Sequence, residues 1–303
     1  MADLKLNGVT PAVGKIKVGN TDVEKIYQGE TLVWPLSTPP CYEFTSKAEL
    51  QTAVNLWVGY PVYAESVYGQ INTWCTGNIT DMSELFMDKT DFNDDISNWD
   101  VSNVTNMYKM FWEAESFNQN IGSWDVSNVQ NMEYMFFRAY SFNQDIGSWD
   151  ISGATNVSRM FQNAQSFNQN INSWDVSGLT ALDEMFFGTF SFNQPLNNWN
   201  TSNVTNMQFM FNSSGFNQDI SSWDTSSVIN MRAMFANADF FNQDIGSWDV
   251  SNVTDMITMF NSAANFNQDL SNWCVTNITS EPANFSLNCP LTQQNKPVWG
   301  TCP

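Results

Sequence analysis

The sequence predicts an α/β repeat solenoid of about nine 25-residue strand–turn–helix units, with a small N-terminal β-module in front of it. Three observations carry this prediction. Tryptophan recurs every 25 residues from Trp74 to Trp273, with a single step of 24. A Phe-Asn pair and a Met-Phe pair keep the same spacing. A fixed period of roughly 20 to 50 residues is the signature of stacked repeats.

Each unit contains two different apolar patterns. Residues 123–127 read SWDVS, so Trp124 and Val126 alternate with polar residues, which predicts a strand with one buried face. The apolar residues of segment 103–111 recur at intervals that fit one face of a short helix: Val104, Met107, Met110 and Phe111. One unit cannot bury these faces alone, so stacked copies are expected to share a core that contains the Trp, Phe and Met rows.

Residues 1–36 have no repeat character. Short alternating runs at Ile16-Val18, Val23-Ile26 and Leu32-Trp34 are separated by turn signals, which predicts about three strands. Such a segment is too short to form a good core by itself. We therefore expect it to act as an attachment or oligomerisation module.

The remaining boundaries follow from composition. Residues 37–73 are expected to form a linker, STPP, and then the N-terminal cap of the solenoid, in which Ser46 and Glu49 could begin a helix as a capping box. The repeats themselves fill residues 74–273. Residues 274–303 contain several prolines and are expected to form the C-terminal cap.

Composition excludes several classes of function. The formal net charge is −20 with only 11 lysines and arginines, so neither nucleic acid nor an anionic membrane is an expected partner. No apolar stretch approaches the length of a membrane helix, and the N-terminus lacks the pattern of a secretory signal. There is no histidine, which removes Ser-His-Asp and Cys-His catalysis. The carboxylates repeat with the unit, whereas an active site should break the repeat at one place, so we do not expect an enzyme.

The five cysteines lie at or outside the ends of the repeat array: Cys41, Cys75, Cys274, Cys289 and Cys302. Two of them, Cys75 and Cys274, take the position that aspartate holds inside the array. A bridge from Cys41 to Cys75, and another between two of the last three, would close the ends. No CxxC pair is present, so a zinc site or a redox pair is not expected.

An acidic row is the candidate ligand-binding face. Its residues occupy the outward positions of the predicted strands: Asp100, Asp125, Asp150, Asp175, Asp224, Asp249, Ser123 and Ser127. Carboxylates on coils about 4.8 Å apart repel by roughly 1 kcal/mol in water, so something must offset the repulsion. Serine and backbone donors would make the row structural, whereas Ca²⁺ or a polar ligand such as a glycan would make it functional. No other cofactor is expected.

The consensus unit SFNQDIGSWDVSNVTNM, followed by MF, closely resembles the BspA-like leucine-rich repeat of bacterial surface proteins. The resemblance covers residues 42–303 and includes the tail PVWGTCP. It implies an LRR-like solenoid with a role in adhesion or protein binding, and it implies no catalytic residues. The N-terminal stretch KIKVGNTDVEKIYQGETLVWP resembles a short module at the start of phage virion and fibre proteins.

Together these features predict a phage virion-associated appendage or fibre-type structural protein. On the virion surface, the N-terminal module would contact other virion proteins and the chain would form homo-oligomers. The solenoid would attach to the host by binding a surface protein or glycan, without entering the membrane. The alternative is a bacterial cell-surface adhesin of the BspA-like type.

Overall fold

The computed structural model describes residues 4–5, 17–18, 21–22, 26–28, 31–34 and 41–303, which divide into two units, 1–42 and 43–303. The first unit contains five short strands: β1 (Leu4–Lys5), β2 (Lys17–Val18), β3 (Thr21–Asp22), β4 (Ile26–Gln28) and β5 (Thr31–Trp34). Strand β4 pairs in parallel with β1 and antiparallel with β5, while β2 and β3 form an antiparallel pair. The predicted strand residues Ile16 and Val23 lie outside the described residues.

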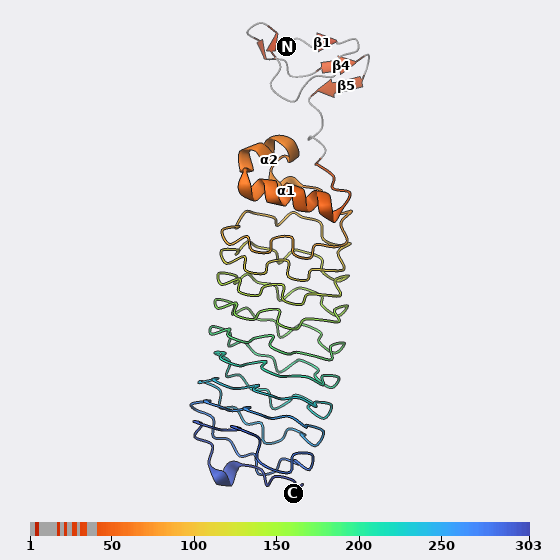
Figure 1. The fold of residues 1–303 in the computed structure, drawn as a ribbon. Coiled ribbons are helices and arrows are strands. Elements are labelled where there is room, and N and C mark those ends of the chain that lie inside the picture. The colour runs from red at the N-terminus through yellow and green to blue at the C-terminus, as the bar shows by residue number, and fades with distance from the viewer. Residues whose placement is uncertain (1–3, 6–16, 19–20, 23–25, 29–30, 35–40) are drawn as a thin grey trace. The chain divides into compact units, whose positions relative to one another are not determined.

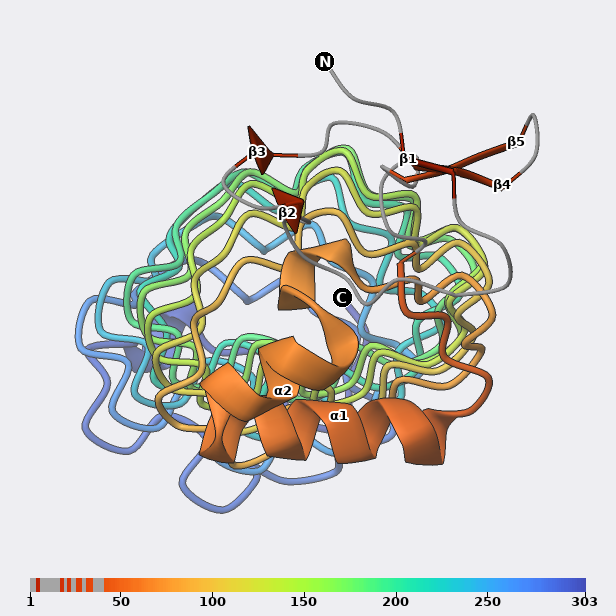
Figure 2. The ribbon, with the colours of Figure 1, turned by 90° about the horizontal axis from the view of Figure 1, so that it is seen from above.

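Two helices begin the second unit, α1 (Lys47–Gly59) and α2 (Pro61–Tyr68). The Ser46 side chain caps α1 by accepting the Glu49 N–H, which confirms the predicted helix start. Helix α1 buries Leu50, Ala53, Val54 and Trp57, and both helices lie across the end of the coil stack (Figures 1 and 2). Within the described residues, no helix is long and apolar enough to cross a membrane.

The repeats form a stack of coils that are joined by backbone hydrogen bonds (Figure 1). Single parallel bridges link equivalent residues, for example Asn106 with Asn131 and Asn131 with Asn156. Beyond each bridge, every second N–H donates to the next coil. Lys109 N donates to the Glu133 carbonyl at 3.0 Å, and the N–H groups of residues 107, 111 and 113 donate in the same way.

The predicted α/β class is wrong. Apart from two 3-10 turns, η1 (Ile71–Thr73) and η2 (Gln293–Asn295), residues 69–303 contain only turns and isolated bridges, without strand–turn–helix units. The predicted helix fails because Lys109 and Glu113 have φ values of 54° and 53°, which a right-handed α-helix cannot contain. Successive turns, such as Met110 N to the Met107 carbonyl, instead bring the apolar residues to one side.

The predicted strand is also an irregular segment. In SWDVS, Trp124 N donates to the Ile121 carbonyl within its own turn, so it does not join a ladder. Neighbouring coils are connected here by side chains, because the Trp124 indole N–H donates to the Ile96 carbonyl of the preceding coil at 3.3 Å. The SWDVS segments therefore stack without forming a sheet.

The Trp, Phe and Met rows form the core, as predicted. Trp124 is 4% exposed, and Met110 and Phe111 are completely buried. Equivalent rings stack along the axis, with centroids 5.5 Å apart for Phe111 and Phe136. Each coil therefore depends on both neighbours to cover its aromatic rings, which is the nearest-neighbour coupling of a repeat protein.

Candidate functional site

The acidic row caps a turn in each coil that carries one of its aspartates, and Asn200 takes this position in one coil. Asp125 Oδ1 accepts hydrogen bonds from the Ser127 N–H at 3.1 Å and from the Ser127 hydroxyl at 2.6 Å. Asp100, Asp150 and Asp224 hold the serine two residues later in the same way. One oxygen of each carboxylate thus fixes the local backbone, and this is the serine-and-backbone role that the sequence left open.

The electrostatics of the row agree with this geometry. Hydrogen bonds from the serine side chain, and then from its N–H, lower the pKa values of five members: Asp100, Asp150, Asp175, Asp224 and Asp249. The charge of Asp150 acts in the opposite direction on the Asp175 pKa, as Asp224 does on Asp249, but the serine contribution is larger. These five carboxylates are therefore ionised at neutral pH.

The serines of the candidate face form hydrogen bonds both within a coil and between coils. Ser127 donates to Asp125 of its own coil, as described above. The equivalents of Ser123 in later coils donate to the carbonyl of the preceding coil, from Ser148 to Gly122 at 3.1 Å and from Ser173 to Gly147 at 2.7 Å. The face is thus a continuous polar network with carboxylates at regular intervals.

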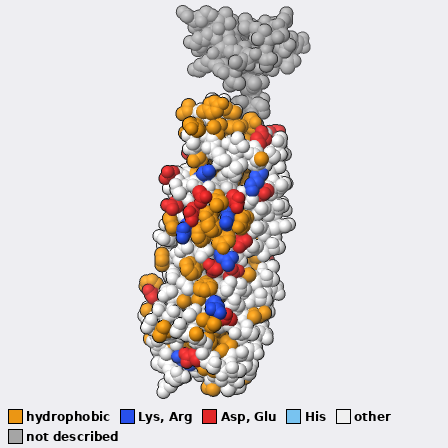
Figure 3. All heavy atoms as spheres, in the orientation of Figure 1, with side chains coloured by type: hydrophobic (Ala, Val, Ile, Leu, Met, Phe, Trp, Pro, Cys, Tyr) orange, Lys and Arg blue, Asp and Glu red, His pale blue; other side chains and the backbone are white. Residues whose placement is uncertain are grey.

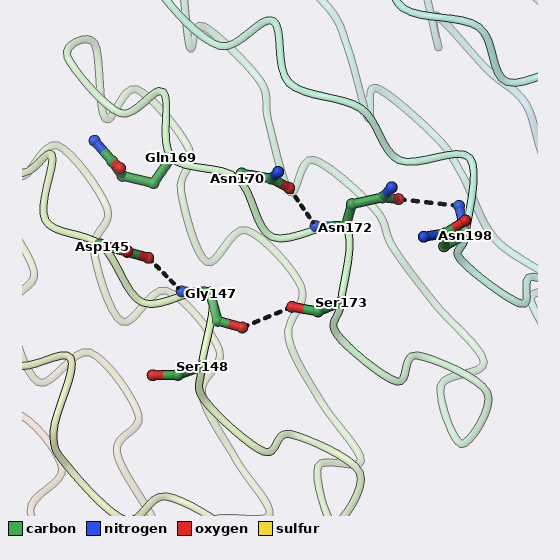
Figure 4. Close-up of a pocket in the computed structure, with 8 residues that line it drawn as sticks. All are labelled: Asp145, Gly147, Ser148, Gln169, Asn170, Asn172, Ser173 and Asn198. Carbon is green, nitrogen blue, oxygen red and sulfur yellow. Dashed lines mark hydrogen bonds between the residues drawn. The ribbon is translucent and has the colours of Figure 1, made fainter.

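A groove of about 480 Å³ opens beside this face (Figure 4). Its lining is entirely polar or glycine: Asp145, Gly147, Ser148, Gln169, Asn170, Asn172, Ser173 and Asn198. Asp145 Oδ1 accepts the Gly147 N–H at 2.9 Å, and Asn170 Oδ1 accepts the Asn172 N–H at 3.0 Å. Asn172 Oδ1 accepts the Asn198 N–H at 2.9 Å, so the walls are held by side-chain-to-backbone bonds.

Several polar groups remain free in this groove. Within the described part of the chain, no hydrogen bond is formed by Asp145 Oδ2, by Asn170 Nδ2 or by the side-chain amide of Asn198. Both a carboxylate acceptor and amide donors are therefore available to a ligand. Such a combination can bind several hydroxyl groups at once.

The groove lies where the sequence departs from its own repeat. Asn172 stands where two earlier coils have Gly122 and Gly147, and Asn198 stands where they have serine. At Gly147 a side chain is excluded, because a Cβ atom would lie 2.5 Å from the Asn170 carbonyl oxygen. The sequence prediction of the acidic face missed these residues, although the departure from the repeat was visible.

A second cavity, of about 230 Å³, lies on the same face at the first coil. Asp100 and Asn98 contribute to its lining, together with Thr76 and Gly77. Both cavities therefore border the predicted acidic face. In the described residues there is no group of three or more Asp, Glu, Cys or His side chains that could hold a metal ion, so the suggested Ca²⁺ gains no support.

The cysteines lie at the ends of the array. Cys274 and Cys302 form a disulfide, and Cys41 and Cys75 are disulfide-bonded as well. Cys289 is a free thiol that donates to the Phe266 carbonyl at 3.3 Å, and burial raises its pKa. It is therefore poorly suited to act as a nucleophile.

One protein family matches the chain, over residues 61–165, 144–215 and 212–299. The family is described as "Mycoplasma protein of unknown function, DUF285", and it is related to the BspA-like repeat surface proteins. No match includes residues 1–60, so the resemblance of the N-terminal segment to phage modules gains no support. No curated protein and no solved structure matches the chain. Because the matched residues cover most of its length and all of its repeats, the chain belongs to the DUF285 family.

Proposed function

We propose that the chain is a non-catalytic recognition protein whose coil stack binds a host-surface glycan along the acidic face and the adjoining groove. The observation that supports this most is the groove itself. It combines a free carboxylate oxygen of Asp145 with free amides of Asn170 and Asn198, beside the row of exposed carboxylates. Sugar hydroxyls donate to carboxylates and accept from amides, so the donors and acceptors match.

The stacking suits a polymeric ligand. Equivalent side chains in successive coils present the same polar group many times along one axis, as Asp125 and Asp150 do. An extended glycan would contact several coils through weak individual bonds, and their sum would exceed any single contact through avidity. A shallow polar face of this kind favours binding of a polymer over turnover of a small substrate.

The biological setting has two candidates. A virion appendage remains our first proposal, with residues 1–36 as the module that attaches to other virion proteins and mediates oligomerisation. The family relationship to BspA-like surface proteins favours the second setting, an adhesin on a bacterial cell surface. Both settings use the same glycan-binding face.

A glycan array tests the proposal. The wild-type chain is expected to bind a subset of bacterial or host surface glycans. The double variant Asp145→Asn, Asn198→Ala should bind about 30-fold more weakly, because it loses two hydrogen bonds that each contribute about 1 kcal/mol. Asparagine can still accept the Gly147 N–H, so the fold should be retained.

The matched control is Asp244→Asn. Asp244 accepts the Gly246 N–H at 3.0 Å in the same local sequence, but it lies outside the groove. This variant should bind like wild type. If the wild type bound no glycan, or if the groove variant and the control bound equally well, the proposed function would be wrong.

A further inference from the structure

A second exposed face lies on the turn segment that follows each bridge residue. Where these segments bury methionine and phenylalanine, the intervening positions reach the surface. In three successive coils they carry a cluster that we call the aromatic–basic face. It consists of the half-buried Tyr108, Lys109, Trp112, Tyr134 and Arg159, and of the buried Phe137 on which Trp112 stacks. Figure 3 shows apolar, basic and acidic side chains gathered on one side of the coil stack.

This face departs from the repeat more strongly than the acidic row does. In later coils the position of Trp112 and Phe137 is occupied by one further aromatic residue, Phe187, and otherwise by Gln162, Asn212, Ala236 and Asn261. The core positions on either side, such as Phe111 and Ala114, keep phenylalanine in every later coil and alanine in all but two, where Thr189 and Ser214 replace it. The coils therefore stack equally well without the aromatic residues, and the cluster is confined to one part of the array.

The backbone also argues that these side chains are not required for folding. Lys109, Tyr134 and Arg159 have φ values of 54°, 57° and 60°, a conformation that is unfavourable for residues with a Cβ atom. The same conformation recurs at the equivalent positions of later coils, which carry Glu184, Phe209, Ala233 and Thr258. The turn therefore forms with many different side chains and does not require Lys109, Tyr134 or Arg159.

The cluster is rigid before any partner binds. The Trp112 and Phe137 rings stack with centroids 3.8 Å apart, and Tyr134 meets Trp112 edge-on at 4.9 Å. The Lys109 ammonium lies 4.3 Å from the Trp112 centroid, and the Arg159 guanidinium lies 5.2 Å from that of Tyr134. A preorganised group of Trp, Tyr and Arg side chains is typical of energetic hot spots at protein interfaces.

The covered ring faces disfavour a sugar as the ligand. Stacking of a sugar needs an open aromatic face, but Trp112 is stacked against Phe137 and lies under the Lys109 ammonium, while Tyr134 lies under the Arg159 guanidinium. What remains exposed are ring edges and the charged groups above them. These suit the apolar and charged side chains of a polypeptide.

The charges on this face indicate that the partner polypeptide presents a negatively charged side chain. The chain has a net charge of −20, yet three of its 11 basic residues, Lys109, Arg138 and Arg159, lie in successive coils here. Arg138 and Arg159 are neutralised by nearby glutamate and aspartate side chains, at 2.9 to 3.4 Å. Lys109 forms no ion pair with any residue that the structure describes, so its charge is available to a carboxylate.

We propose that the aromatic–basic face is a protein-docking surface for a polypeptide segment that presents an acidic side chain beside an apolar one. The acidic side chain pairs with Lys109, and the apolar side chain packs against the edges of Trp112 and Tyr134. This surface is separate from the groove that contains Asp145. The two faces can therefore bind a protein and a glycan independently.

The test is a selection from a random peptide display library on the intact chain. Counter-selection removes peptides that also bind the double variant Lys109→Gln, Trp112→Ala. The matched control is Asn261→Ala, because Asn261 occupies the position of Trp112 in a late coil. Peptides enriched on wild type and lost on the double variant should carry Asp or Glu next to a large apolar residue. Their affinity should fall about ten-fold or more in the double variant and stay unchanged in the control.

Thermal unfolding of the double variant is measured in parallel. Because later coils stack with Asn212, Ala236 or Asn261 at the position of Trp112, the Tm of the double variant should stay near that of wild type. The proposal is overturned if the selected peptides lack acidic residues, or if they bind the double variant as well as wild type. It is equally overturned if the double variant loses glycan binding instead, which would make this face part of the glycan site.

Discussion

Removal of one core tryptophan should reveal how the coils are coupled. Trp174 is 2% exposed, and its indole N–H donates to the Ile146 carbonyl of the preceding coil at 3.1 Å. Its ring also stacks against Phe161 with centroids 6.1 Å apart. Trp174→Ala would leave a large cavity in a stack that rigid neighbours prevent from collapsing. It would also remove one of the two hydrogen bonds to the Ile146 carbonyl, which would still accept the Trp149 N–H at 3.1 Å.

The magnitude follows from these two losses. Truncation of a buried Trp to Ala costs about 3 to 5 kcal/mol, and part of that is the lost indole hydrogen bond, at about 0.5 to 1.5 kcal/mol. Trp174→Phe helps to separate them, because it keeps a six-membered aromatic ring and loses the N–H together with the rest of the indole. We expect it to cost about 1 to 3 kcal/mol.

Calorimetry and urea unfolding measure both variants. Because the coils couple mainly to their neighbours, Trp174→Ala should also split the single thermal transition into two. If Trp174→Ala lowered the free energy of unfolding by less than about 1 kcal/mol, Trp174 could not be an essential part of the core. Such a result would mean that the tryptophan row contributes little to the core, and a surface role for these rings would then have to be considered.

Three other perturbations test the ends and the acidic row. The folded state lowers the pKa values of Asp150 and Asp175, so the stability that they contribute is present above the unfolded pKa of about 3.9 and is lost as pH falls through the folded pKa values. The Tm of the wild type should therefore hold from pH 7 to about 5 and drop below about pH 4. The drop should be smaller in the variant Asp150→Asn, Asp175→Asn, and an equal drop in both proteins would contradict the assignment. The disulfide between Cys274 and Cys302 closes a loop over a separation of 28 residues. Its reduction should lower the free energy of unfolding in urea by about 3 to 4 kcal/mol. An unchanged unfolding midpoint would show that the C-terminal cap is stable without the disulfide. A chain that begins at Cys41 should fail to incorporate into particles while its coil stack still unfolds cooperatively; full incorporation would rule out attachment through residues 1–36.

The sequence was sufficient to predict the period, the buried rows and the helix that starts after Ser46. These features depend on composition at fixed spacing, which is visible in one chain. The coil backbone was not predictable in the same way. Apolar residues three and four apart, such as Met107, Met110 and Phe111, are produced both by a helix and by successive turns, and no glycine marks the positive φ of Lys109.

The candidate groove could not be predicted from the sequence either. Asn172 and Asn198 can be recognised as departures from the repeat, but they lie in different coils, and only stacking brings them beside Asp145. The acidic row was easier to find because it repeats in six of the units, at Asp100, Asp125, Asp150, Asp175, Asp224 and Asp249. Its turn-capping bonds to serine depend on local backbone geometry, which alternation of polar and apolar residues does not specify.

In the proposed function, the coil stack binds its ligand on the polar face and in the groove beside it. Backbone hydrogen exchange, measured with and without the tightest-binding glycan from the array, tests this most directly. We predict slower exchange at the N–H groups of Gly147, Asn172 and Asn198, which line the groove, and no change around Trp112. Protection confined to the aromatic–basic face, or no protection anywhere along the coils, would contradict the claim.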